Sequence, residues 1–385
     1  MNKVIYNYDM AGTKRILLTG GVTGGHIAPL LAVADEFKKM DFVDMELFYI
    51  GPKTPLSQEF LNRDIPVYRI ASSKLRRYFS FANFIDVPKF IWSVFQSLFR
   101  LYFLMPSVVF SKGGPGAFAV VLAAKFYMIP VIIHESDTIP GMTNRLSAKF
   151  AKRIGVAFES AAKYFSSKKV YVCGNPIRAG LLIQEAVEEA AKSNLKFKKE
   201  LGLIFIYSGS QGAVRINRFI FDNLEILLGR YQIFHQAGEK NLEEAKTVSQ
   251  QVLGGLSSEI RERYQAEGFL GFEKLRVVFQ AADIVISRAG SSSIFEIAAF
   301  GKPSILVPIP TEVVGDHQLM NAYEYAKTGA AVVVEEGNLT PNLVLSQIDN
   351  ILGDKNKYMA MSTAAKKFSR PDSASIIAQE ILKIR

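Results

Sequence analysis

Short apolar segments alternate with longer helical segments along the chain, and this alternation starts twice. Such alternation is typical of parallel sheets in α/β proteins. In the first half, strands are expected at 15–20, 47–51, 67–71, 107–113, 131–135, 153–158 and 169–174. A polar helical segment, 184–202, separates them from a second series at 203–207, 231–238, 283–287, 303–310 and 330–336. The sequence therefore predicts an α/β protein with two Rossmann-like domains.

The chain of 385 residues is long enough for two domains, each with its own core. We expect the first domain to comprise residues 1–178 and the second residues 179–372, followed by an amphipathic helix at about 373–385. The single cysteine, Cys173, excludes a disulfide within the chain. No apolar run reaches the roughly 20 residues needed to span a bilayer. The net charge of +10 predicts attraction to an anionic partner: a phosphorylated substrate, an acidic lipid or a nucleic acid.

A glycine-rich loop, TGGVTGGHIAP at 19–29, follows the first expected strand. It lacks the Walker A lysine, because His26 follows the last glycine, and its glycine spacing does not fit the dinucleotide fingerprint. We expect Pro29 to begin a helix whose N-terminus favours an anionic ligand. His26 titrates near neutral pH and could accept a proton from a hydroxyl group. The alternative is a tight turn in which His26 caps its own helix.

Two further junctions between a strand and a helix are rich in glycine. SKGGPGAF, at 111–118, indicates close approach of the backbone, for which packing or a turn is the simpler explanation. In YSGSQGAVRIN, at 207–217, backbone amides and the Ser210 hydroxyl could hold phosphate oxygens. Ser210 could equally cap the following helix, and the two roles are compatible.

Polar side chains gather after two later strands. Ser291, Ser292 and Ser293 precede an expected helix, and Glu296 lies one turn into it, where a carboxylate can bind the paired hydroxyls of a ribose. A second polar cluster occurs at helical spacing in 315–322 and consists of Asp316, His317, Gln318 and Asn321. Since ligands bind at the carboxyl ends of strands in open α/β sheets, both clusters are candidates for substrate binding.

Several other chemistries are not indicated by the sequence. Histidines, cysteine and carboxylates do not show metal-ligand spacing, so no metal or other cofactor is predicted. His134 and His235 lie inside apolar strands and are expected to be core residues. No recognised nucleic-acid-binding motif is present, so nucleic acid is not expected as the anionic partner.

Seven segments, taken in order, resemble motifs of the MurG family of peptidoglycan glycosyltransferases, glycosyltransferase family 28. They are TGGVTGGHIAP, HESDTIPGMTN, CGNPIR, GSQGAVRIN, HQAG, DIVISRAGSSSIFEIAAFGKPSILVP and DHQLMNA. The resemblance implies the GT-B architecture: two Rossmann-like domains face a central cleft, and the C-terminal helix crosses back to the first domain. It implies inverting transfer of GlcNAc from UDP-GlcNAc to lipid I (undecaprenyl-pyrophosphoryl-MurNAc-pentapeptide), which yields lipid II.

The resemblance also implies roles for individual residues, with His26 as the general base. The remaining matched residues are expected to contact substrates: Thr23, Gly24 and Gly25 near the sugar and acceptor, Arg178 and Ser210 at the donor including its diphosphate, Ser291, Ser292 and Ser293 at the nucleotide and phosphates, Glu296 at the ribose, Gln318 and Asn321 at the sugar hydroxyls, and the backbone near Phe272 at the uracil.

The chain departs from the family's motifs at four places. Val22 stands where a glycine is usual, and YSGSQGA replaces GGSQGA. GGPGAF replaces the usual GGY pattern near the acceptor. Asp137 replaces an asparagine that approaches the donor sugar, and an ionised aspartate cannot donate a hydrogen bond.

A lipid-linked acceptor implies docking as a peripheral protein on the cytoplasmic face of the cell membrane, where contacts with other cell-wall synthesis proteins are also implied. Aromatic and basic residues precede Pro88 in a pattern that suits an anionic lipid surface. The candidates for this membrane contact are Lys74, Leu75, Arg76, Arg77, Phe79, Phe81 and Phe84. In the following helix, by contrast, Ile91, Val94, Phe95 and Leu98 are expected to form an ordinary buried face.

Three other functions fit the same motifs less completely. A related GT-B glycosyltransferase that acts on another lipid, such as diacylglycerol, would have a similar donor half. A UDP-GlcNAc 2-epimerase would need neither an acceptor nor a lipid surface. A sugar-nucleotide-binding protein without catalysis would not need His26.

Overall fold

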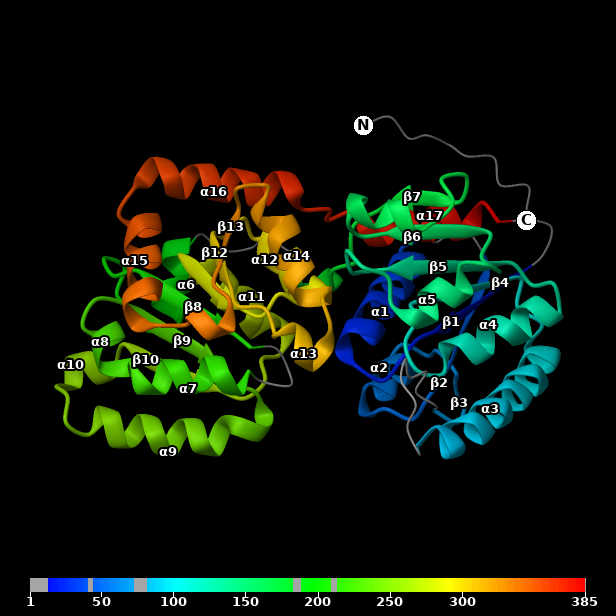
Figure 1. Ribbon diagram of the computed structural model, residues 1–385, viewed down its shortest axis with the longest axis horizontal. Helices are drawn as coiled ribbons and strands as arrows, with labels where there is room; N and C mark the ends of the chain where they lie inside the picture. Colours follow the sequence, from blue (N-terminus) through cyan, green and yellow to red (C-terminus); the bar gives the residue numbers. More distant parts are fainter. Residues whose placement is uncertain (1–12, 41–43, 73–81, 183–187, 209–212, 385) are drawn as a thin grey trace.

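The computed structural model describes residues 13–40, 44–72, 82–182, 188–208 and 213–384. It contains two parallel sheets, and each forms the centre of one half of the molecule (Figure 1). The first has seven strands in the order β3-β2-β1-β4-β5-β6-β7, and the second has six in the order β10-β9-β8-β11-β12-β13. The predicted two Rossmann-like domains are confirmed.

The first sheet is formed by strands from the first 172 residues. Its elements in chain order are β1 (Lys14–Thr19), α1 (Gly24–Lys38), β2 (Met45–Gly51), α2 (Gln58–Leu61), β3 (Val67–Arg69), α3 (Ala82–Leu104), β4 (Val108–Ser111), α4 (Ala117–Phe126), β5 (Val131–Glu135), α5 (Met142–Ser147), β6 (Arg153–Val156) and β7 (Val170–Val172). Short 3-10 helices lie at Pro55–Ser57, Glu159–Tyr164 and Ala179–Leu181.

The second sheet is formed by the remaining strands. Its elements are α6 (Glu188–Asn194), β8 (Leu203–Tyr207), α7 (Val214–Asp222), α8 (Leu224–Leu228), β9 (Gln232–Gln236), α9 (Leu242–Leu253), α10 (Ser258–Arg261), β10 (Tyr264–Glu267), α11 (Phe272–Ala281), β11 (Ile284–Ser287), α12 (Ser291–Ala299), β12 (Ser304–Leu306), α13 (Thr311–Val314), α14 (His317–Ala326), β13 (Ala331–Val333), α15 (Pro341–Leu352) and α16 (Lys355–Phe368). Two 3-10 helices lie at Glu239–Asn241 and Glu336–Asn338.

The central strands are buried along their whole length because helices cover both faces of each sheet. Every residue of β4, β5, β8 and β9 is buried. Burial on both faces is typical of parallel sheets in α/β proteins, and the inner residues of these strands are mostly apolar. Each sheet therefore separates two apolar clusters, one on either face.

The last helix, α17 (Ser373–Leu382), returns to the first half of the molecule (Figure 1). Its Ile377 and Ile381 are fully buried in the apolar cluster that contains α1. The Lys14 ammonium donates hydrogen bonds of 2.8 Å to the carbonyl oxygens of Leu382 and Ile384, which satisfies acceptors left free at the helix end. The crossing back of the C-terminal helix is confirmed.

The helix after the first glycine-rich loop begins earlier than predicted. α1 starts at Gly24, and Pro29 lies inside it. Proline is compatible with helical φ but cannot donate a hydrogen bond to the residue four positions earlier, which here is Gly25. His26 therefore lies in the first turn of α1, with its backbone N–H bonded to the Thr23 carbonyl at 3.0 Å.

The prediction that Ile91, Val94, Phe95 and Leu98 form a buried face of α3 is wrong for two of them. Ile91 and Phe95 are 51% and 60% exposed, whereas Ser93 and Ser97 are fully buried. α3 packs on α4, which is rich in alanine, so the small serine side chains allow close approach of the two helices. The larger side chains are consequently placed on the outer face of α3.

Candidate active site

A pocket of about 470 Å³ lies between the two domains. The first domain contributes residues of α1 and the region around α2, which are Gly24, Gly25, Ile27, Ala28, Leu31, Leu56 and Glu59. Arg178, at the boundary between the predicted domains, also lines the pocket, and the second domain contributes Tyr207, Gln236, Phe269, Leu270, Gly271, Phe272, Leu275, Ser292, Ser293 and Glu296. The pocket adjoins the carboxyl ends of strands from both sheets, as expected for ligand binding in open α/β folds.

Gly24, Gly25 and Ile27, on either side of His26, line this pocket, and the His26 imidazole itself lies between the glycine-rich segments 19–25 and 113–116. A Cβ atom on Gly114 would be only 2.8 Å from His26 Nε2, and one on Gly21 would be 2.9 Å from Nδ1. Gly114 also has a φ of +86°, which side chains other than glycine rarely adopt. Glycine in both segments is therefore what makes room for the imidazole ring.

His26 is held by Thr23, whose Oγ1 lies 2.8 Å from Nδ1. Burial, and then the positive charge of Lys112, lower the pKa of His26 to about 4. The imidazole is therefore neutral at pH 7. If Nδ1 carries the proton and donates it to Thr23, Nε2 has a free lone pair that can accept a proton.

On the opposite wall of the pocket, Glu296 is held by two side chains. Its Oε1 accepts a hydrogen bond from Arg178 Nη2 at 3.0 Å, and its Oε2 accepts one from the Tyr207 hydroxyl at 2.5 Å. The Arg178 guanidinium also lies over the Phe272 ring, 4.7 Å from its centroid. Burial, and then the Glu296 charge, raise the pKa of Tyr207 well above its ordinary value, so the phenol remains a donor.

The loop that follows β5 connects the two domains through hydrogen bonds. Asn321 Nδ2 donates to Asp137 Oδ1 at 2.8 Å, while Asn321 Oδ1 accepts from the backbone N–H and the hydroxyl of Thr138 at 2.9 and 3.0 Å. The Ser291 hydroxyl donates to the Ser136 carbonyl at 2.6 Å. These hydrogen bonds therefore hold the N-terminal parts of α12 and α14 against the first domain, beside the pocket.

The structure brings most of the predicted substrate-binding residues together. Those that line the pocket are Gly24, Gly25, Arg178, Phe272, Ser292, Ser293 and Glu296. Thr23 precedes α1 and contacts His26, whereas Ser291, Asn321 and Asp137 take part in the contact between the domains. Gln318 lies on α14, where its Oε1 accepts a hydrogen bond of 3.3 Å from the Ile309 N–H.

Some predicted residues lie outside the described part of the chain. Ser210 falls in 209–212, and most of the membrane-contact candidates fall in 73–81: Lys74, Leu75, Arg76, Arg77, Phe79 and Phe81. Phe84 is on α3, but its side chain is outside the description.

Two residues at the site carried no prediction from the sequence. Tyr207 ends β8 and contacts Glu296, and Lys112 follows β4 and lies close enough to affect His26. The local sequence around Tyr207 is that of an ordinary strand, and its role depends on the carboxylate of Glu296, which lies 89 positions later in the chain. His235, expected in the core, is indeed buried, with hydrogen bonds to Tyr264 and Asn217.

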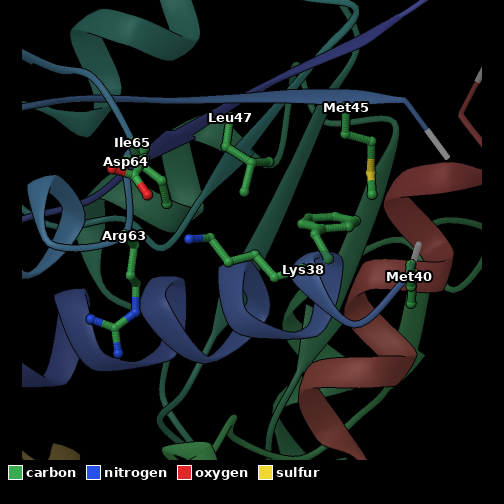
Figure 2. A pocket seen from close by; sticks show the side chains of 8 residues that line it. Lys38, Met40, Met45, Leu47, Arg63, Asp64 and Ile65 are labelled. Atoms are coloured by element: carbon green, nitrogen blue, oxygen red, sulfur yellow. The ribbon is translucent and has the colours of Figure 1, made fainter. Parts of the chain in front are cut away.

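A second pocket, of about 320 Å³, lies beside the C-terminal half of α1 and strand β2 (Figure 2). Apolar side chains such as Phe37, Met45 and Leu47 line it, together with Lys38 and Arg63. The Arg63 guanidinium is already engaged, because it donates to the carboxylates of Asp35 and Glu59 at 2.7 and 2.9 Å. This pocket contains no group that the chemistry at His26 uses.

Two family models match the chain. The N-terminal domain of glycosyltransferase family 28 matches residues 16–156, and its C-terminal domain matches residues 203–377. The two models therefore match both domains that line the pocket.

Individual relatives match over nearly their full length. A protein of Clostridium kluyveri named UDP-N-acetylglucosamine–N-acetylmuramyl-(pentapeptide) pyrophosphoryl-undecaprenol N-acetylglucosamine transferase is 35% identical, covering 90% of this chain and 93% of its own. A protein of the same name from Legionella pneumophila is 35% identical over 95% and 96%.

Solved structures agree with these matches. The crystal structure of MurG from Acinetobacter baumannii superposes with a TM-score of 0.73 at 25% identity, covering 96% of this chain and 99% of that one. A UDP-N-acetylglucosamine 2-epimerase from Neisseria meningitidis has a TM-score of 0.67 at 14% identity, with 96% and 100% covered, which reflects the shared fold alone. The chain belongs to glycosyltransferase family 28, with the MurG-type N-acetylglucosaminyltransferases.

Proposed function

We propose that this enzyme transfers GlcNAc from UDP-GlcNAc to N-acetylmuramyl-(pentapeptide) pyrophosphoryl-undecaprenol, forming lipid II. One observation carries the proposal: Gly24, Gly25 and Ile27, on either side of the neutral His26, line the same pocket as the paired Arg178 and Glu296 side chains. A base on one wall and a nucleotide-binding group on the other are what glycosyl transfer between two bound substrates requires.

In this mechanism, His26 Nε2 accepts the proton of the acceptor O4 hydroxyl. The oxygen attacks C1 of GlcNAc from the face opposite UDP, and the bond between C1 and the β-phosphate oxygen breaks with its electron pair leaving on UDP. The configuration at C1 is therefore inverted. Base assistance of this kind contributes about 10²- to 10⁴-fold to the rate.

The second domain is suited to bind the donor and to stabilise the leaving diphosphate. Glu296 can accept hydrogen bonds from two ribose hydroxyls, because a carboxylate has about four acceptor sites. The N-terminus of α12, with Ser292 and Ser293 beside the pocket, offers N–H and hydroxyl donors for phosphate oxygens. Arg178 supplies the nearby positive charge.

The outer face of α3 supports docking on an anionic membrane surface from the cytoplasmic side. Its large side chains are more than half exposed: Val87, Ile91, Trp92, Phe95, Phe99, Tyr102 and Phe103. Phe126 and Met128, at the end of the neighbouring α4, are also exposed. Exposed apolar surface of this extent marks an interaction site, and the chain's positive charge favours acidic lipid. In the described residues, no helix is both long and apolar enough to cross a membrane.

The test combines UDP-GlcNAc with a soluble lipid I analogue and measures both UDP release and formation of the disaccharide. Acceptor-dependent release that falls at least 100-fold in His26→Asn, with UDP affinity unchanged, supports the transferase and its base. Release without acceptor indicates hydrolysis or epimerisation, and ManNAc-containing product identifies the latter. UDP-GlcNAc binding without transfer to lipid I, but with transfer to diacylglycerol, assigns another lipid acceptor.

A further inference from the structure

Gln236 is a buried polar residue that lines the pocket between the domains and has no role in the mechanism above. It ends β9 and belongs to the HQAG motif at 235–238. Only 2% of the residue is exposed, and in the described part of the chain its Oε1 atom has no hydrogen-bond partner. A buried oxygen without a partner is costly, so a donor group on a bound ligand is the expected explanation.

The other polar side chains of β9 find their partners inside the protein. Both ring nitrogens of His235 lie within 3.0 Å of side-chain oxygens. At the opposite end of the strand, Gln232 accepts a hydrogen bond from the Lys198 N–H at 2.7 Å and donates one to the Lys198 carbonyl at 2.8 Å. Of the three polar residues of β9, Gln236 alone combines an unpartnered oxygen with a place on the pocket wall.

The neighbours of Gln236 in the sheet indicate which part of a ligand it meets. The register places it beside Tyr207 of β8 and Glu267 of β10. Tyr207 holds Glu296, the carboxylate that is proposed to bind the ribose. β10 leads into the loop before Phe272, where the backbone is expected to meet the base, and residues 269–272 line the pocket. Gln236 therefore lies between the group for the ribose and the segment for the base.

An amide side chain matches one edge of uracil. The N3–H of uracil is a donor and its O2, on the side of the ribose, is an acceptor. A glutamine can accept from N3–H with Oε1 and donate to O2 with Nε2. Cytosine has acceptors at both N3 and O2, so in either orientation of the amide its oxygen faces an acceptor. An amide at this edge therefore binds uracil and rejects cytosine.

We propose that Gln236 determines the base specificity of the donor site, because its side-chain amide binds N3–H and O2 of uracil. The backbone near Phe272 is then left to bind O4. The choice of a uridine nucleotide as ligand rests on the proposed function. Gln236 does not touch the reacting atoms, so its effect is on donor binding and not on the chemical step.

Calorimetric titration of the full chain with UDP and with CDP tests the proposal. Gln236→Met keeps the length of the side chain but removes both hydrogen-bonding groups. Wild-type protein should prefer UDP. In Gln236→Met, UDP should bind about tenfold more weakly while CDP binding changes little, so the preference shrinks by the same factor. The preference for UDP over 2′-deoxy-UDP should stay, since the ribose group is intact. Equal binding of UDP and CDP by wild-type protein, or an unchanged preference in Gln236→Met, overturns the proposal.

Gln232→Met is the matched control, because it removes a buried amide from the same strand whose hydrogen bonds are internal. It should lower the Tm and leave the preference for UDP over CDP unchanged. An equal loss of preference in both variants overturns the proposal, since it would be an effect of stability alone. Should Gln236→Met not fold, Gln236→Leu makes the same test.

The transfer assay separates this inference from the proposed function. With lipid I as acceptor, Gln236→Met should raise the KM for UDP-GlcNAc and leave kcat little changed. Transfer to lipid I with an unchanged preference for UDP over CDP in the variant overturns the role of Gln236 and leaves the proposed function standing. A lost preference in a protein that transfers nothing to lipid I overturns the proposed function instead, and leaves base recognition by Gln236 established.

Discussion

Asn321 of the second domain donates a hydrogen bond to Asp137 of the first, with 2.8 Å between Nδ2 and Oδ1. Both residues were predicted to contact substrate, and here they contact each other. The Asn321 side chain is fully buried, and its oxygen also accepts from the N–H and hydroxyl of Thr138. The contact between the domains therefore uses the same polar groups that the donor sugar is expected to meet.

Asp137→Asn should keep this contact and improve donor binding. An amide oxygen can still accept from Asn321, while the new NH₂ group can donate to a sugar hydroxyl. We expect the KM for UDP-GlcNAc to fall several-fold with kcat little changed. Asp137→Ala, which cannot accept, should raise this KM by about tenfold, equivalent to one lost hydrogen bond to a charged group.

Initial rates over a range of UDP-GlcNAc concentrations give both constants. Asp222→Ala is the matched control, because Asp222 is an exposed aspartate at the end of α7 and does not line the pocket between the domains. An Asp137→Asn enzyme with a raised KM would show that the carboxylate itself is required for donor binding.

The architecture was predictable because buried parallel strands leave a simple pattern in the sequence. Which face of α3 is buried was not predictable, because that helix carries large apolar residues on its outer side and small polar residues on its inner side. Ser93 and Ser97 are buried because their small side chains fit against the alanine-rich surface of α4. Their polarity alone would predict exposure. Hydropathy alone therefore assigned Ile91 and Phe95 to the core, although both are more than half exposed.

The residues of the candidate site were predictable where a glycine-rich or polar motif follows a strand. They were less predictable where a residue's role depends on contacts with a distant part of the chain. His26, Arg178 and Glu296 were identified from motifs, and the last two form an ion pair at 3.0 Å. Tyr207 and Lys112 were missed, because each is a single residue at a strand end whose importance comes from neighbours elsewhere in the chain.

Tyr207→Phe should weaken recognition of the ribose. The phenol holds one oxygen of Glu296, and without it that buried carboxylate loses a hydrogen bond worth about 1.5–3 kcal/mol. We expect UDP to bind roughly tenfold more weakly and the preference for UDP over 2′-deoxy-UDP to shrink. Calorimetric titration with both nucleotides measures the two effects.

The control for this prediction is Tyr231→Phe in the same domain. Tyr231 also donates its hydroxyl to a carboxylate, that of Asp349, but it does not line the pocket between the domains. Equal loss of UDP affinity in the two variants would mean that stability, and not the orientation of Glu296, explains the effect.

Gly114→Ala should reduce transfer severely. The added Cβ would lie 2.8 Å from His26 Nε2 and 2.9 Å from Gly21 Cα, so either the imidazole or the opposing loop must move. The expected loss in kcat is about 10²-fold, since a displaced base contributes little. Gly329→Ala is the matched control. Gly329 has a φ of +85°, close to the +86° of Gly114, but a Cβ atom there would lie in open space.

Gly329→Ala should therefore show the backbone strain alone, of about 1 kcal/mol, and keep its transfer rate. Thermal melts of the two variants, measured beside the rates, separate strain from the steric effect. Comparable losses of activity in both would contradict the role assigned to Gly114.

The pH dependence of transfer should reflect the low pKa of His26. A base works only when unprotonated, so activity should persist as the pH falls through 6.5, the ordinary histidine pKa, and decline towards about 4. The same shift makes folding stability fall with decreasing pH over this interval, because the unfolded chain binds the proton more readily. His235, whose pKa burial lowers to about 3, adds to this loss of stability.

Measurement of kcat/KM between pH 4.5 and 8, with near-UV circular dichroism at each pH, distinguishes titration of the base from acid unfolding. His26→Gln should show no acid limb from this group in its residual activity. A wild-type midpoint near 6.5 with intact tertiary structure would show that the imidazole is more solvated than its position beside Gly114 implies.

The outer face of α3 should govern binding to lipid. Phe99 and Phe103 are each 64% exposed and contact each other edge-on, with 4.8 Å between their ring centroids. The double variant Phe99→Glu/Phe103→Glu loses apolar surface and gains negative charge. Its affinity for vesicles of phosphatidylglycerol and phosphatidylethanolamine, measured by sedimentation, should therefore fall at least tenfold. Met359→Glu, at a 54% exposed position on α16, is the matched control.

The two variants should differ in one further respect. Transfer to a short-chain, soluble lipid I analogue should be the same in both, because α3 does not line the pocket between the domains, whereas transfer to lipid I in vesicles should fall only when α3 is altered. Equal vesicle binding by the two variants would assign the exposed face of α3 to a protein partner instead of a membrane. Loss of activity on the soluble analogue would instead mean that the charges disturb the packing of α3 on α4.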